Sequence, residues 1–364
     1  PRPMSVEPLK SETTPLTAAA DVPIAVGIPI AGGTLQMVAP SIGEDATKLI
    51  DANTAKILNS VNSFKIKQRV QWLEAVTGGC IEQSNVYDIY DASTGALIMV
   101  GMERSEDWTR CCCAPHHSLF VDFKTVGGKG GIEDVQRMGR AGLAGLPTTM
   151  TLEREGCCSK PCLGCCICHD SCKTSSSLHA GALDAGAKAG TVGPTAPTCV
   201  GYTTQPTGGG IFTPTVQIMD RAKGVGEFAA LAKVEGPCLF GGCSELCFES
   251  KWPISKMTPA TANTTLKLGD MAVITKLRPK TWGQFAKEAF TDSDTYTMEF
   301  KEEAKLAPQQ KATMIASLIV VDYMFFEQDK GMCDCSDGLK ITFFECYCLG
   351  CVCPCNLHIR KSQE

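Results

Sequence analysis

Cysteines are the residues of this chain with the clearest capacity for chemistry. The sequence holds 22 of them, and many are adjacent: Cys111 to Cys113 are consecutive, and Cys157–Cys158 and Cys165–Cys166 are pairs. Adjacent cysteines rarely have the geometry to bridge each other, and disulfide frameworks belong to small secreted chains with spaced cysteines. We see no secretory signal at the start of the sequence. The clusters therefore predict thiols held in a reducing, cytosol-facing environment.

The densest cluster, residues 157–172, suits two kinds of chemistry. Neighbouring thiols can carry several acyl chains, and several are needed because one chain holds a protein to a bilayer only marginally. The spacing Cys162-x-x-Cys165-x-x-Cys168, followed by His169 and Cys172, also offers ligands for tetrahedral zinc. Plain thiols that pack as small apolar residues are the third reading. The thiols concerned are Cys157, Cys158, Cys162, Cys165, Cys166 and Cys168.

A second group of cysteines lies near the C-terminal end of the sequence. Its unit Cys348-Leu-Gly-Cys351 repeats Cys162-Leu-Gly-Cys165, and the apolar residues Ile341 to Phe344 precede it. We expect a second acylated or interfacial patch here, and the competing reading is a metal knuckle. The candidate residues are Cys348, Cys351, Cys353, Cys355 and His358.

Composition sets the frame for these sites. Hydrophobic residues make up 44% of the 364, enough for a sizeable core. The formal net charge of −5 speaks against the broad basic surface that nucleic-acid binders use. We therefore expect a folded protein with no nucleic-acid partner.

Patterning divides the chain into four parts. Residues 1–43 are rich in Pro, Thr, Ala and Gly and are typical of an arm laid on a partner. Residues 44–78 carry apolar residues at loose helical spacing and predict an amphipathic helical lead-in. Residues 79–328 form the main domain, and residues 329–364 form a cysteine-rich extension.

The main domain reads as an all-β meander of short apolar runs. Asp91 to Gly95 is expected to be a hairpin loop with Gly95 in a left-handed conformation. Two Gly- and Ala-rich stretches, 127–147 and 173–197, are expected to be surface insertions. The predicted strands are Asn85–Tyr90, Ala96–Val100, Ser118–Phe123, Thr148–Leu152, Phe212–Met219 and Phe228–Val234.

A continuous apolar run ends the main domain and predicts a helix over 312–327. A helix that is apolar all round must be buried in protein or lipid. About 20 apolar residues are needed to cross a bilayer, and this run is shorter and contains an aspartate, so a core helix is favoured. Its central residues are Met314, Ile315, Leu318, Ile319, Val320, Asp322, Phe325 and Phe326.

Several segments, taken in order, resemble the phospholipid scramblase family. Each is short, and their shared order over roughly residues 65–328 is far more specific than any one of them. These segments are Gln71 to Gly78 leading into Val86 to Tyr90, Trp108 to Cys113, Thr151 to Arg154, Gly236 to Cys238, Trp282-Gly, Glu288 to Asp294 and Ala312 to Glu327.

The resemblance implies a mainly β fold, a closed antiparallel Tubby-like β-barrel of about twelve strands that encloses the C-terminal apolar helix. A barrel interior would shelter a helix that is too short and too acidic to cross a membrane comfortably. The resemblance also places residues 157–172 where scramblases carry S-palmitoylated cysteines. It therefore implies covalent palmitate, with acylation sites at Cys157, Cys158, Cys162, Cys165, Cys166 and Cys168. The wider spacing of the cysteines here leaves the number of acylated sites open.

The resemblance further points to a calcium-binding segment, Asp292 to Glu303, that is similar to an EF-hand loop. Calcium prefers several hard oxygens, and Asp292, Asp294 and Glu303 supply them at positions one, three and twelve. Thr297 stands where an EF-hand has glycine. The alternative from the residues is a strand over Thr295 to Phe300, because that stretch alternates.

Two functions are expected from different classes. One is ATP-independent movement of phospholipids between leaflets, in keeping with the missing Walker motif. The other is a non-catalytic, lipid-anchored adaptor that meets protein partners through the N-terminal arm and the C-terminal extension. Either would sit on a membrane, the cytosolic face of the plasma membrane or a mitochondrial membrane. His116-His117 is expected to be an ordinary pair at a solvent-exposed edge, so a hydrolase has little support.

Overall fold

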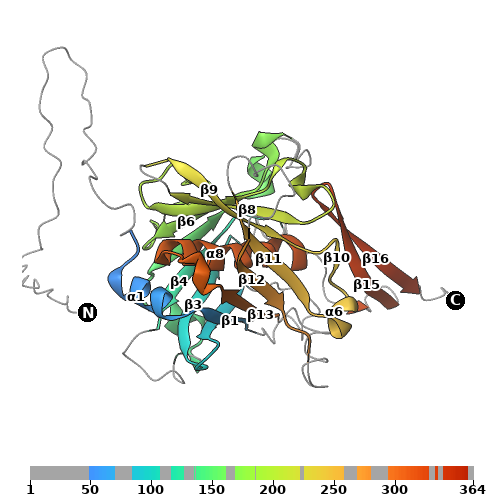
Figure 1. Ribbon diagram of the computed structural model, residues 1–364, viewed down its shortest axis with the longest axis horizontal. Helices are drawn as coiled ribbons and strands as arrows, with labels where there is room; N and C mark the ends of the chain where they lie inside the picture. Colours follow the sequence, from blue (N-terminus) through green and yellow to red (C-terminus); the bar gives the residue numbers. More distant parts are fainter. Residues whose placement is uncertain are drawn as a thin grey trace, which may run out of the picture. The chain divides into compact units, whose positions relative to one another are not determined.

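Twelve antiparallel strands close into a barrel, and one helix runs through its middle (Figure 1). The computed structural model describes residues 49–69, 84–106, 116–126, 135, 137–160, 169–184, 186–221, 225–257, 269–279, 294–327, 333–334 and 339–359. All of these lie within one compact unit, Ala46–Glu364. The closed barrel and its C-terminal helix confirm the predicted fold class.

The barrel strands follow one another around the wall in the order β1-β13-β12-β11-β9-β8-β7-β6-β5-β4-β3-β2. The first strand of the chain therefore pairs with both the second and the last barrel strand, which closes the wall. The strands are β1 (Ser63–Gln68), β2 (Val86–Asp91), β3 (Leu97–Arg104), β4 (Leu119–Thr125), β5 (Met150–Arg154), β6 (Ser175–Ala180), β7 (Cys199–Thr204), β8 (Thr215–Arg221), β9 (Phe228–Glu235), β11 (Ser250–Lys256), β12 (Asp270–Lys276) and β13 (Thr295–Phe300).

Strand sequence and barrel geometry agree in β13. Its residues Tyr296, Met298 and Phe300 are buried, and the residues between them are exposed or half-buried. This period of two is what a strand shows when one face lines the lumen. In contrast, all five residues of β5 are buried, so its outer face is covered as well.

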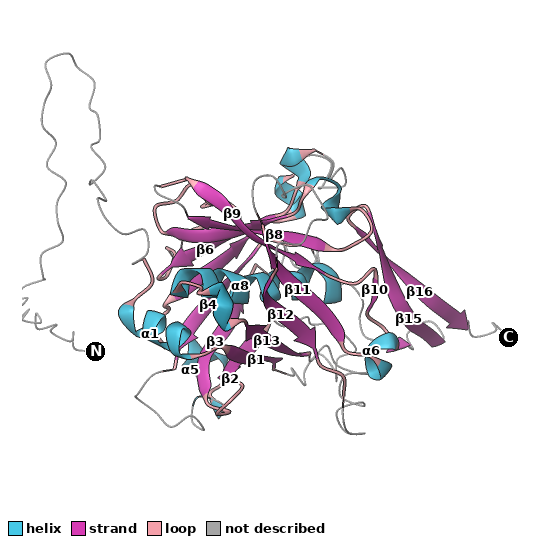
Figure 2. Ribbon diagram, in the orientation of Figure 1, coloured by secondary structure: helices cyan, strands magenta, loops and turns pink. Residues whose placement is uncertain are grey.

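The central helix has two parts, α8 (Pro308–Val321) and the π-helical turn η7 (Asp322–Phe326). Pro308 stands at the first helical position, where its missing N–H costs nothing, and the Gln310 side chain accepts the N–H of Ala307 at 3.0 Å. Figure 2 shows the helix among the strands. All the residues predicted for its centre are buried except Phe326, which is half-buried. In the described part of the chain, no helix has the length and apolar character that a bilayer crossing requires.

The remaining elements flank the barrel strands and the central helix. Helix α1 (Ala52–Ser60) is capped by the Asp51 carboxylate and packs against α8. A small second sheet pairs β10 (Leu239–Phe240) and β14 (Cys333–Asp334) with β15 (Leu339–Cys348), which also pairs with β16 (Cys351–Ile359). Short helical turns complete the list: α5 (Arg140–Ala144), η2 (Cys157–Ser159), η4 (Asp170–Cys172), η5 (Thr207–Gly210), α6 (Ser244–Cys247) and η6 (Glu302–Ala304).

Two expectations about the wall need correction. The lead-in 44–78 contains α1, but it also contains β1, so the barrel begins before residue 79. The stretch 173–197 is not only a surface insertion, because it contains strand β6, whose Ser-rich sequence hides the strand pattern. The hairpin at Asp91 to Gly95 is confirmed, and Gly95 has φ of 73°.

Candidate functional site

The end of the central helix packs in an aromatic cluster inside the barrel. Trp252 of β11 stacks on Phe325 with 5.3 Å between ring centroids, and Phe240 meets both of these rings edge to face. Tyr347 of β15 contacts Phe325 from the second sheet at 5.7 Å. Aromatic contacts of this kind add stability beyond area burial. They hold the helix end in place against two sheets.

Asp322 is the carboxylate in the middle of the predicted apolar run, and it is buried. Its oxygens accept the hydroxyl of Tyr87 at 2.8 Å and that of Tyr296 at 2.5 Å. Burial raises the pKa of Asp322 to about 6, the charge of Asp294 adds to this rise, and the two hydroxyl groups act against it. The helix therefore carries a titratable group in the lumen.

Glu103 of β3 is the second buried carboxylate at this end of the helix. It accepts the hydroxyl of Tyr323 at 2.7 Å and the backbone N–H of Asn85 at 2.7 Å. His117 lies 3.3 Å away through Nε2 and is only 2% exposed. The expectation of a solvent-edge histidine pair is therefore wrong for His117, because the ring packs inside on Tyr323 and Glu103.

The predicted calcium segment is only partly a loop. Asp292 lies outside the described residues, Thr295–Phe300 is strand β13, and Glu303 is exposed in η6 beyond the far end of that strand. Six strand residues separate Asp294 from that end by about 20 Å. The alternating strand reading is confirmed, and Asp294 and Glu303 do not meet as ligands of one EF-hand-like loop.

Asp294 has a different partner in the structure. The Lys276 ammonium lies 2.7 Å from Asp294 and 2.7 Å from Glu245, and all three side chains are largely buried. Burial lowers the pKa of Lys276, but the two carboxylates outweigh this effect and raise it well above its usual value. A cation is thus already built into this position by the chain itself.

The main cysteine cluster is described only at its edges. Cys157 is a free, half-buried thiol in η2, and Cys172 is free and buried. Cys158 is disulfide-bonded, so in this structure its thiol is not open to acylation. Cys162, Cys165, Cys166 and Cys168 lie outside the described residues.

The second cysteine group forms a β-hairpin, not a knuckle. Cys351, Cys353 and Cys355 occupy every second position of β16 and therefore point to one face of the strand. His358 belongs to the opposite face and pairs with Lys340. Among the described residues, no three or more His, Cys, Asp or Glu side chains gather as a metal site. The knuckle reading is wrong, because the extended strand separates its ligands.

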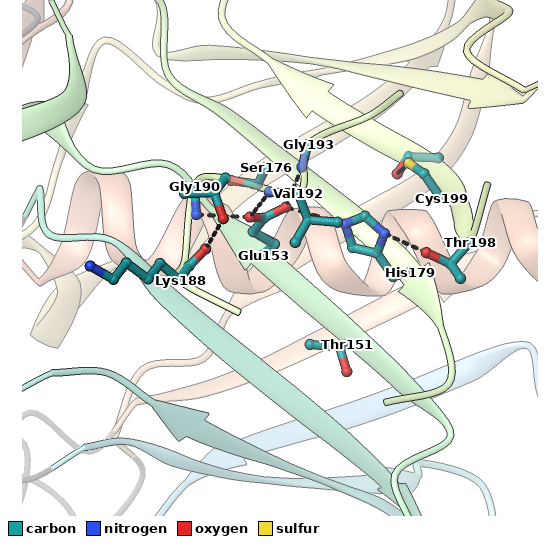
Figure 3. A network of polar contacts seen from close by, with 12 residues as sticks. Thr151, Glu153, Ser176, His179, Lys188, Gly190, Val192, Gly193, Thr198 and Cys199 are labelled. Atoms are coloured by element: carbon teal, nitrogen blue, oxygen red, sulfur yellow. Dashed lines mark hydrogen bonds and ion pairs between the residues drawn. The ribbon is translucent and has the colours of Figure 1, made fainter. Parts of the chain in front are cut away.

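A carboxylate that sequence reasoning missed holds the outer wall together (Figure 3). Glu153 of β5 points out of the barrel, where its oxygens accept three backbone N–H groups of an overlying loop and face His179 Nε2 at 3.3 Å. His179 Nδ1 lies 3.1 Å from the Thr198 hydroxyl. The three donors are Gly190 at 2.8 Å, Val192 at 2.9 Å and Gly193 at 2.7 Å.

Electrostatics make this a structural clamp. Burial raises the pKa of Glu153, but the hydrogen bonds from His179, Val192 and Gly193 outweigh it and lower the pKa below its usual value. The nearby thiol of Cys199 has its pKa raised to about 12 by burial, so it is no activated nucleophile. The signal available in the sequence was the presence of Gly190 and Gly193. In the structure their φ angles of 87° and 68° let their N–H groups converge on one carboxylate.

The fold thus defines a closed β-barrel protein filled by its own C-terminal helix. The family model named Scramblase matches residues 44–129 and 238–328. The matched segments contain the first four strands, Phe240, Trp252 and Phe325 of the aromatic cluster, and the whole central helix. The chain belongs to the phospholipid scramblase family.

Curated relatives agree with this assignment. The chain is 26% identical over 298 residues to phospholipid scramblase 1 of Rattus norvegicus, which covers 82% of this chain and 68% of that protein. It is 26% identical over 275 residues to phospholipid scramblase 2 of Bos taurus, covering 75% and 71%. Phospholipid scramblase 1 of Homo sapiens is 25% identical over 271 residues, covering 74% of this chain and 64% of that protein. No solved structure matches the chain.

Proposed function

We propose that this protein moves phospholipids in both directions between bilayer leaflets without ATP. The observation that carries the proposal is the family match over the segments that build the barrel entry and the central helix, joined to relatives named phospholipid scramblases. The sequence has no Walker-type nucleotide motif, which suits passive transport. In this proposal the protein does no covalent chemistry on the lipid.

The filled lumen constrains how lipids could pass. Helix α8 is buried along nearly its whole length, so the described barrel offers no open path beside it. Lipid movement therefore requires that the helix leave the barrel or that several copies assemble. In the first case the buried polar ring of Asp322, Tyr87 and Tyr296 would be uncovered, and these groups could meet a phospholipid headgroup.

Membrane attachment is proposed to come from palmitate on cysteines. Cys157 is free and half-buried, and the β15–β16 hairpin offers the exposed thiols Cys348, Cys351, Cys353 and Cys355 as a second acylated patch. Several chains are needed for firm anchoring. Loss of fatty-acyl mass on hydroxylamine treatment of the intact protein supports the anchor, and an unchanged mass contradicts it.

Calcium is proposed as an activator, with Asp292, Asp294 and Glu303 as candidate ligands. Since Lys276 already neutralises Asp294, calcium would have to displace an ion pair there or bind Asp292 and Glu303 separately. Isothermal titration of the full chain with calcium tests this. Heat of binding that disappears in Asp292→Asn supports the site, and an identical titration in that variant argues against it.

Reconstitution tests the main proposal. Purified protein is placed in liposomes that carry a fluorescent phospholipid in both leaflets. The fraction of the fluorescence that dithionite bleaches should rise from about one half towards the whole. The rate should rise with protein density and need no nucleotide. A bleached fraction equal to that of empty liposomes, with intact barrel fold, contradicts scrambling.

A second function is favoured by one observation, the exposed hairpin. Its residues Leu339, Leu357 and Ile359 are 38%, 45% and 54% exposed, and the hairpin lies beyond the residues that the family model matches. An adaptor that docks a lipid-anchored barrel onto a larger membrane assembly would use such a surface. If the protein is an adaptor, the liposome assay stays at background. The protein then purifies from plasma membrane or mitochondria together with partner proteins, and a variant that lacks residues 339–359 loses these partners.

A further inference from the structure

The outward face of the β15–β16 hairpin carries cysteines in register. Cys346 lies opposite Cys353, and Cys348 lies opposite Cys351. All four thiols are free, and three of them are exposed. Residues that face each other across antiparallel strands point to the same side. The hairpin therefore displays two neighbouring thiol pairs on one surface.

The rest of the hairpin holds these pairs in place. Its inner face carries Tyr347, which is buried and donates its hydroxyl to the Gly209 carbonyl at 2.8 Å. The turn residues Leu349 and Gly350 have φ of 48° and 87°, as a tight two-residue hairpin turn requires. The N–H of Leu349 donates to the Ile211 carbonyl at 2.7 Å, which ties the turn to the loop after η5. The thiol pairs thus stand on a fixed frame.

Strand geometry disfavours disulfides within these pairs. A two-residue turn closes on a hydrogen-bonded pair, so Cys348 and Cys351 are of that kind, and alternation makes Cys346 and Cys353 so as well. Such pairs have Cβ atoms about 5–5.5 Å apart, whereas a relaxed disulfide needs about 3.5–4.5 Å. The Cys346 thiol instead donates to the Cys353 carbonyl at 3.3 Å. A gap of about this size therefore separates the two side chains of each pair.

This gap fits one soft metal ion. Two metal–thiolate bonds of roughly 2.3 Å span roughly 4.6 Å between sulfurs. Zinc takes four ligands in almost all protein sites, and the described residues gather no group of three or more. Thiolates select soft ions such as Cu(I), which accepts two of them. We propose that, in chains whose hairpin cysteines carry no palmitate, Cys346/Cys353 and Cys348/Cys351 each bind one Cu(I) ion, which makes the hairpin a copper-binding surface.

The test is a copper competition on the full chain. Reduced, oxygen-free protein is titrated with Cu(I) in the presence of a chromogenic Cu(I) chelator, and the retained equivalents are counted. The variant C346S/C348S/C351S/C353S should retain two equivalents fewer than the unchanged chain. The single variant Cys348→Ser, which removes one ligand of one pair, should retain one fewer.

The matched control is C238S/C247S/C355S, because these thiols are exposed and free but none lies opposite a cysteine. It should retain as much copper as the unchanged chain. Equal retention by the unchanged chain and both hairpin variants overturns the proposal, and so does an equal loss in the control. Tight zinc binding that Cys348→Ser abolishes would also overturn it, since that result requires four ligands to converge.

Discussion

The hydroxyl of Tyr87, on strand β2, donates a hydrogen bond of 2.8 Å to Oδ2 of Asp322 on the buried helix. The two residues are 235 positions apart in the sequence. This contact joins the start of the barrel wall to the helix that fills it. It also places a titratable carboxyl where solvent does not reach, so the stability of the barrel should depend on pH.

The pH dependence has a defined sign. The folded-state pKa of Asp322, about 6, lies above the ordinary 3.8, so the folded chain keeps a proton that the unfolded chain has lost. This contribution is full below pH 3.8 and is lost as the pH rises through 6. It amounts to on the order of 3 kcal/mol. Asp322→Asn should remove this part of the slope in thermal melts from pH 4 to 8, whereas Asp184→Asn, at an exposed position, should keep it. Parallel melting curves for Asp322→Asn and the unchanged chain would contradict the assignment.

The buried ion pairs of Lys276 should be costly to break. Lys276→Met leaves the carboxylates of Glu245 and Asp294 without their cation, which should lower the free energy of unfolding by about 3–5 kcal/mol. Denaturant unfolding measures this loss. The exposed Lys251→Met on β11 is the matched control and should change little. Adding Glu245→Gln to Lys276→Met should recover part of the loss, and a loss below about 1 kcal/mol would show that the three groups are solvated.

At Gly201, strand β7 of the wall lies close against the helix. A Cβ at this position would lie 2.5 Å from the Thr313 hydroxyl and 3.0 Å from the Met219 carbonyl. Gly201→Ala should therefore cost about 1–3 kcal/mol by overpacking. Thr313→Ala should be partly compensating in the double variant, and Gly139→Ala, which has open space, should be neutral. Additive effects of Gly201→Ala and Thr313→Ala would mean that the helix does not lie against β7.

The Glu153 clamp should protect the loop amides that it binds. Glu153→Gln removes the charge that Gly190, Val192 and Gly193 share, so hydrogen exchange of these amides should accelerate at least about tenfold. Because the pKa of Glu153 is lowered, the protection is present above its ordinary value of 4.5 and is lost as the pH falls through the lower folded-state pKa. The exposed Glu227→Gln should leave exchange unchanged. Unaltered exchange in Glu153→Gln would mean that the loop is held by other contacts.

Sequence reasoning reached the fold because the helix and the family motifs are strong local signals. The apolar run 312–327 predicts a buried helix, and the alternation of polar and apolar residues predicts strand β13. Strand β6 was not predicted, because Ser-Ser-Ser-Leu-His-Ala has no alternation of apolar and polar residues. Only the folded wall buries Leu178 and His179. The polar sites were not predicted from the sequence for a different reason. Glu153, Glu103 and Lys276 meet partners from distant strands, and only the closed wall brings them together.

The position of the central helix along the chain also sets an order of events during synthesis. Every strand of the barrel leaves the ribosome before Pro308 does, and β1 must wait for β13 before the wall can close. The barrel strands of the nascent chain, residues 63–300, thus expose lumen-facing side chains before the helix can cover them. Arrest of translation just before α8 should therefore leave a chaperone-bound chain, because the wall is made before the helix that fills it.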